Sequence, residues 1–126
     1  MKKHVDQIVL SASDLVGHLN CGHLTELDFR VAEGALAKPK HWDPLLEILR
    51  ERGDQHEKAF IEHLEAQGLT SVRIDGVDIT PAAVAETQAA MESGAQIIVQ
   101  AALAHGRWAG RADILRRVEK PSNIGS

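Results

Sequence analysis

Apolar residues recur at helical spacing in some stretches of the chain, and they alternate or run together in others. Helices are predicted at four places: after the start sequence Ser11-Ala12-Ser13-Asp14, over 24–31, over 43–67 and over 82–93. Strands are predicted over 70–74, 96–104 and 108–118. The last two strands flank His105-Gly106-Arg107, which is typical of a β-hairpin turn.

This order of elements predicts an α/β fold in which helices pack on a small mixed sheet. Loops are expected over 35–41, where Pro39 ends the regular pattern, and over 121–126. The 126 residues suffice for one domain with one core. We therefore expect a single domain over residues 1–126.

The composition is that of a globular protein, with 44% hydrophobic and 25% charged residues. No apolar run approaches the ~20 residues of a membrane helix, so we expect no membrane association. The first residues lack the apolar core of a signal peptide, which makes a cytoplasmic protein the expectation. One cysteine, Cys21, excludes a disulfide within the chain.

Charge is unevenly distributed along the chain. The net charge is -4, yet the segment 105–120 contains five positive and two negative residues. A basic edge on an acidic protein can contact nucleic-acid phosphates. A solvated hairpin face is an equally good interpretation. The candidate phosphate contacts are Arg107, Arg111, Arg116 and Arg117.

The long predicted helix carries an imidazole on its apolar stripe. Residues 45, 49, 53, 56, 60 and 64 recur at steps of four and three, so His56 is expected to point towards the core. Gly53, one turn earlier, predicts close approach of another backbone. With Glu57 beside it, His56 suits a metal site. The alternative is a core histidine bonded to a backbone carbonyl.

Asp113 lies inside a predicted strand, where aspartate is disfavoured. Strict alternation puts it on one face with Arg111, Leu115 and Arg117. A cation would account for a carboxylate at this place. The alternative is a salt bridge to Arg111 or Arg117 on an exposed face.

Cys21 stands between two histidines in the spacing His18-x-x-Cys21-x-His23. This suggests zinc, although a structural zinc site usually has four clear ligands. The alternative is a small buried residue at a helix junction.

Taken together, the motifs resemble the RecB-like nucleases of the PD-(D/E)XK superfamily. In that family a Gly-x-x-His or Gly-x-x-x-His on a helix precedes a hairpin that carries Gly-x-x-Asp. Here these are Gly53 to His56 and Gly110 to Asp113. Predicted nucleases of this kind also carry Ser-x-x-Asp-Leu and Cys-x-His-Leu-Thr-x-Leu-Asp, which occur at 11–15 and 21–28. The resemblance covers nearly the whole chain.

The resemblance implies part of a restriction-endonuclease-like core that cleaves DNA with Mg²⁺ or Mn²⁺. It implies His56 and Asp113 as catalytic metal ligands, with Glu57 as an auxiliary ligand. In some relatives an N-terminal cysteine, here Cys21, joins three C-terminal cysteines around a 4Fe–4S cluster, which this chain alone cannot complete.

The third motif of the family, an acidic residue two positions before a lysine, does not occur in the sequence. It would belong to the strand after the hairpin, so we expect residues 1–126 to be the N-terminal portion of a longer nuclease domain. The chain by itself is then expected to be inactive, because two protein ligands hold Mg²⁺ weakly.

Two other functions fit the same sequence. A non-catalytic nucleic-acid-binding module, such as a winged-helix-like domain, would use the basic hairpin as its wing and need no metal. A scaffold fragment would have no ligand of its own. If the chain ends before the next strand of a nuclease core, the strand over 108–118 leaves an open sheet edge, through which we expect a homodimer. A monomer would favour the binding module.

Overall fold

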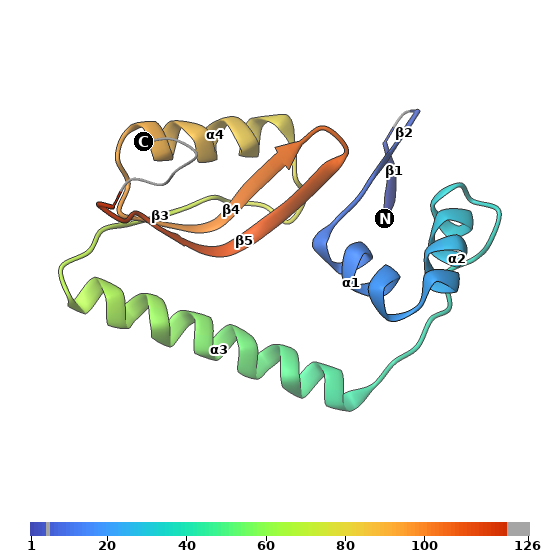
Figure 1. The fold of residues 1–126 in the computed structure, drawn as a ribbon. Coiled ribbons are helices and arrows are strands. Elements are labelled where there is room, and N and C mark those ends of the chain that lie inside the picture. Colours follow the sequence, from blue (N-terminus) through green and yellow to red (C-terminus); the bar gives the residue numbers. More distant parts are fainter. Residues whose placement is uncertain (5, 121–126) are drawn as a thin grey trace.

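The computed structural model describes residues 1–4 and 6–120, so the loop predicted over 121–126 lies outside the described residues. The chain combines helices and strands, which confirms the α/β class (Figure 1). Its elements are β1 (Lys2–His4), β2 (Gln7–Val9), α1 (Ala12–Asn20), α2 (Gly22–Ala32), α3 (Pro44–Ala66), β3 (Ser71–Arg73), α4 (Pro81–Glu92), β4 (Ile97–His105) and β5 (Trp108–Arg116).

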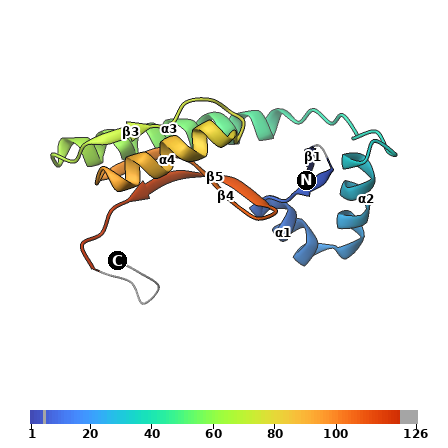
Figure 2. The same cartoon turned by 90° about the horizontal axis from the view of Figure 1, so that it is seen from above.

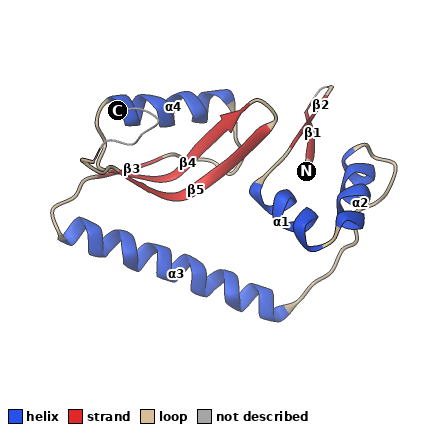
Figure 3. Ribbon diagram, in the orientation of Figure 1, coloured by secondary structure: helices blue, strands red, loops and turns tan. Residues whose placement is uncertain are grey.

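The main sheet has three strands in the order β3-β4-β5 and lies between two helices (Figure 3). The short strand β3 runs parallel to β4, and β4 pairs antiparallel with β5. Helix α4 lies along one side of this sheet and α3 along the other, as Figure 1 shows. The predicted arrangement of helices on a small mixed sheet is therefore confirmed.

Predicted helix ends agree with the caps that form. The Asp43 carboxylate accepts a hydrogen bond from the Leu45 amide at 2.9 Å, next to Pro44 at the first helical position. The Thr80 hydroxyl accepts one from the Ala83 amide at 3.1 Å. Gly68 and Gly94 follow α3 and α4 with positive φ, a conformation that favours glycine at a helix end.

Two small clusters of buried side chains hold the sheet to its helices. On the α4 side, Ile74 and Ile98 pack with buried alanines of α4 and β4. On the α3 side, Ile61 and Leu64 pack with Ile97 and Val99. Only the last turns of α3 contribute buried residues, so the helix is attached to the sheet through its C-terminal part.

The remainder of α3 corrects the predicted apolar stripe. Leu45 and Leu49 are exposed by 59% and 56%, and Phe60 by 44%. Leu64 alone of the predicted stripe is buried, and His56 is exposed rather than directed into a core. The helix runs beyond the sheet, so its first half has no layer to pack against (Figure 1). Periodicity identified the helix, but it did not show how much of it the sheet covers.

Gly53 also departs from expectation. A Cβ atom built on Gly53 would meet no atom within 4 Å, so close approach of another backbone, the reason predicted for this glycine, is wrong.

The first residues form a hairpin, β1 with β2, that the sequence did not predict. Strands of three residues are too short for a periodic signal. The residue after it, Leu10, bridges to Trp108 at the tip of the β4–β5 hairpin. The Leu10 amide donates to the Arg107 carbonyl at 2.7 Å, and the Ala109 amide donates to the Leu10 carbonyl at 2.9 Å. Figure 2 shows β1 and α1 beyond the hairpin tip, away from α4.

Within the described residues, no helix has the length and apolar character needed to cross a membrane.

Candidate functional site

A cavity of about 400 Å³ lies between α3 and β5 and collects the chemistry-bearing side chains. Its lining residues are Arg50, Gly53, Asp54, His56, Glu57, Phe60, Asp113 and Ile114. His56 and Asp113, the metal ligands that the resemblance implies, both line this cavity. A larger cavity of about 610 Å³, between α1, α4 and the hairpin, is lined mainly by apolar side chains, with the imidazole-bearing His105 on its wall.

The hairpin ladder is interrupted at Asp113. Paired residues run from Ile97 with Arg116 to Val99 with Ile114, then resume at Ala101 with Ala112. The pair between them, Gln100 with Asp113, is absent from the ladder. Around this point, Asp113 and Ile114 both line the cavity on the α3 side, so the predicted strict alternation of faces fails there.

Gln100 occupies the space between two carboxylates. Its side-chain Nε2 lies 3.2 Å and 3.1 Å from the two oxygens of Glu57, and 3.4 Å from Oδ1 of Asp113. The amide therefore donates to acidic groups from α3 and from β5 together. Glu57, predicted only as an auxiliary ligand, is the α3 carboxylate that meets Asp113 through this amide.

The alternatives considered for His56 and Asp113 do not describe this arrangement. His56 is exposed, so it is not a core histidine. In the part of the chain that the structure describes, the salt bridges include none between Asp113 and an arginine. The carboxylate is held instead by the Gln100 amide.

The guanidinium of Arg111 is hydrogen-bonded to backbone carbonyls of the protein itself. Nη1 donates to the carbonyls of Ile74 and Gln100, at 3.1 Å and 2.6 Å. Nη2 donates to the carbonyls of Asp75 and Asp78, at 3.2 Å and 3.1 Å. Among the described residues, its buried Nε has no hydrogen-bond partner. We therefore leave Arg111 out of the phosphate contacts proposed below.

The other hairpin arginines do not gather at one place. Arg107 lies in the turn, whereas Arg116 and Arg117 lie at the far end of β5, separated from it by about 3.3 Å per strand residue. Arg117 contacts the Gly94 carbonyl and Glu119, both at 3.5 Å. They therefore do not form the single basic patch that their closeness in sequence suggested.

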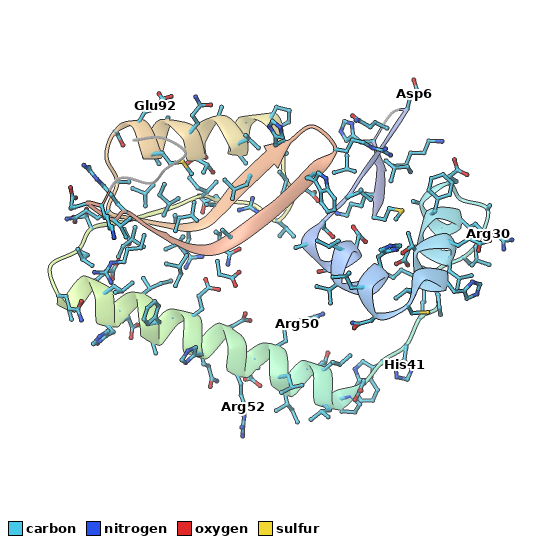
Figure 4. All side chains as sticks on the ribbon, in the orientation of Figure 1. Asp6, Arg30, His41, Arg50, Arg52 and Glu92 are labelled. Carbon is cyan, nitrogen blue, oxygen red and sulfur yellow. The ribbon has the colours of Figure 1, made fainter. Side chains whose placement is uncertain are left out.

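Arg50 is a cavity residue that sequence reasoning missed. It lines the cavity with His56 and Glu57, and Figure 4 shows it projecting from α3 on the side of the sheet, whereas Arg52 projects away. Its spacing from Gly53 and Glu57, three and seven residues, was the signal available in the sequence. Gln100 carried no such signal, because a glutamine in a strand is ordinary.

Cys21 is exposed between α1 and α2, which rules out the small buried residue as its description. His18 shares a hydrogen bond of 2.9 Å with Thr25, and His23 lies 3.7 Å from Glu26. Neither imidazole contact involves the cysteine.

The chemistry of the cavity suits a hard divalent cation in part. Carboxylate oxygens are the ligands that Mg²⁺ and Mn²⁺ prefer, and two of them meet at one amide. However, over residues 1–4 and 6–120 no group of three or more His, Cys, Asp or Glu side chains is arranged to hold a metal ion. The carboxylates of Glu57 and Asp113 are thus the fitting donors, and His56 lines the wall beside them.

Comparisons with protein-family models, with curated proteins and with solved structures found no match to this chain.

Proposed function

We propose that this chain carries the metal-binding part of a phosphodiesterase that acts on DNA in the cytoplasm. The observation that supports the proposal is the meeting of Glu57 and Asp113, from different elements, at one amide on the wall of a cavity that His56 also lines. The RecB-like resemblance of the sequence points the same way and supplies the expected metal, Mg²⁺ or Mn²⁺.

In this proposal the two carboxylates hold the ion. A bound divalent ion lowers the pKa of its water and neutralises charge on phosphate. Arg50 contacts a phosphate oxygen from the α3 side of the cavity, which a guanidinium does with directional hydrogen bonds. Arg107, Arg116 and Arg117 are proposed as further contacts along the nucleic-acid backbone.

Cleavage by the chain of 126 residues is expected to be weak or absent. The sequence has no acidic residue two positions before a lysine, so the third motif is not supplied. Metal binding and DNA binding are therefore better tests than turnover.

The decisive experiment is a titration of the protein with Mn²⁺. Binding is monitored by calorimetry or by the loss of the electron paramagnetic resonance signal of the free ion. Wild type is expected to bind one ion. Glu57→Gln and Asp113→Asn should each weaken binding at least tenfold, because each removes a charged ligand. The matched control is Glu51→Gln, an exposed carboxylate of the same helix outside the cavity, which should bind Mn²⁺ as wild type does.

Absence of saturable Mn²⁺ binding to wild type would rule the proposal out. DNA binding that does not depend on Mn²⁺, and that the Arg107→Ala substitution weakens, would instead favour the metal-free binding module. A salt dependence of that binding would follow from the phosphate contacts.

A further inference from the structure

Gln100 has a backbone conformation that its residue type disfavours. Its φ is 56°, and among the described residues it is the only non-glycine with positive φ. Such a conformation is costly for a long side chain and persists only where surrounding contacts enforce it. It occurs here in the middle of β4, at the position where the ladder with β5 is interrupted.

The contacts that enforce it come from both ends of the residue. The Gln100 carbonyl accepts a hydrogen bond of 2.6 Å from Arg111, whose guanidinium also spans the carbonyls of Ile74, Asp75 and Asp78. The side chain, in turn, reaches Glu57 and Asp113. Arg111 therefore fixes the backbone, and the amide is directed into the acidic pair.

A neutral donor at this place has a specific electrostatic effect. Two carboxylates that share a site repel each other, so they separate unless something lies between them. A lysine or arginine would neutralise them and compete with a cation. An amide hydrogen-bonds to both and leaves their full negative charge available.

We propose that Gln100 is a positioning residue that holds Glu57 and Asp113 together for the cation, and that the strained backbone at residue 100 is kept for this purpose. The inference rests on the proposed function, which it deepens by adding a third member to the site. Gln100 acts through the two carboxylates.

Two substitutions separate positioning from ordinary structural support. Gln100→Ala removes the amide and keeps a side chain at positive φ. Gln100→Gly removes the amide and relieves the backbone, because glycine adopts positive φ freely. Both variants should weaken Mn²⁺ binding about tenfold, as expected for loss of roughly one charge-assisted contact. The glycine variant should melt at the wild-type temperature or above it, and the alanine variant below it.

Lower Mn²⁺ affinity in a Gln100→Gly variant of undiminished Tm is the result that supports positioning. Unchanged affinity in both variants would overturn it. A parallel fall of affinity and Tm in the glycine variant would also overturn it, since the residue would then be structural. Gln55→Ala, at an exposed glutamine of α3, is the control for both measurements.

A second readout keeps the inference apart from the proposed function. The side-chain amide protons of Gln100 should shift in nuclear magnetic resonance spectra of Glu57→Gln and of Asp113→Asn without any metal. If wild type binds no Mn²⁺ but these shifts occur, the proposed function fails while the bridging role stands. If neither substitution changes the chemical shifts of these amide protons, the bridging role itself is wrong.

Discussion

Arg111 Nη1 donates to the carbonyl oxygen of Gln100 at 2.6 Å, and through this contact β5 is joined to the irregular point of β4. The same guanidinium holds the chain that follows β3, through the carbonyls of Asp75 and Asp78. A residue predicted to face phosphate is thus a structural bracket between three segments.

Arg111→Ala should reduce the free energy of unfolding by about 2–4 kcal/mol, because several carbonyls lose a charged donor. Arg111→Lys should recover only a minor part, since an ammonium cannot span the same acceptors. Urea denaturation measures both. Arg116→Ala, at an exposed position of the same strand, should change stability by less than about 0.5 kcal/mol. Equal effects at 111 and 116 would contradict the bracket.

Asp14 should stabilise the folded protein at neutral pH, and this stabilisation should be lost in acid. Burial alone raises the pKa of the Asp14 carboxyl, but hydrogen bonds from the Met1 α-amino group and from Ser11 outweigh it and hold the pKa below its ordinary value of 3.8. Because the folded pKa is the lower one, this stabilisation is fully present above about pH 4 and is lost as pH falls through the folded value.

The measurement is urea denaturation of wild type and Asp14→Asn at neutral and acid pH. The substitution should cost about 1–3 kcal/mol at pH 7 and progressively less below pH 4. Asp28→Asn, on α2 and outside these contacts, serves as the control. A cost of Asp14→Asn that does not change with pH would contradict the ionic origin.

Alanine substitutions of two glycines should change the stability of the protein in opposite directions. Gly53 lies inside α3 with free space around its Cα, so Gly53→Ala should stabilise the protein by about 0.5–1 kcal/mol. Gly94 has φ of +80°, a conformation that strains any L side chain; the atom nearest to a Cβ there, Nη1 of Arg117 at 2.8 Å, is the end of a flexible side chain that can move away. Gly94→Ala should therefore destabilise the protein by about 1–2 kcal/mol. Thermal unfolding of the two variants tests both expectations. If Gly53→Ala lowered the stability, that would contradict the free space found around Gly53.

Self-association is expected at micromolar concentration. β5 is an edge strand of the sheet, and α3 presents exposed Leu45, Ile48 and Leu49. Arg116 and Arg117 near the edge repel their copies, so salt should strengthen the association by screening them. Sedimentation at low and high salt is the test. A monomer of 13.7 kDa under both conditions would contradict it.

Secondary structure followed from the sequence where local chemistry determines it. The caps at Asp43 and Thr80 and the glycine at the hairpin turn placed α3, α4 and the β4–β5 hairpin within a few residues. The burial of α3 could not be predicted from the sequence, because it depends on how far the sheet extends along the helix. A helical stripe is periodic whether or not anything covers it.

Of the candidate site, the sequence predicted His56, Glu57 and Asp113. Asp113 and His56 drew attention because their residue types conflict with their expected surroundings. Gln100 does not conflict with its surroundings, so nothing in the sequence distinguished it. Arg50 could have been found only from its helical spacing to Gly53 and Glu57. The backbone angle at Gln100 is set by the tertiary contacts of Arg111, which no local pattern encodes.

The missing pair in the β4–β5 ladder divides the hairpin into two arms. The inner arm is held by β3 and both core clusters. The outer arm packs on α4 through Ala101 and Ala102 and ends at the contact between Leu10 and Trp108. A ribbon bends most easily where no cross-strand pairing resists it, which here is the junction of Gln100 and Asp113. The acidic pair therefore lies at the joint between the two arms, where cross-strand pairing is absent.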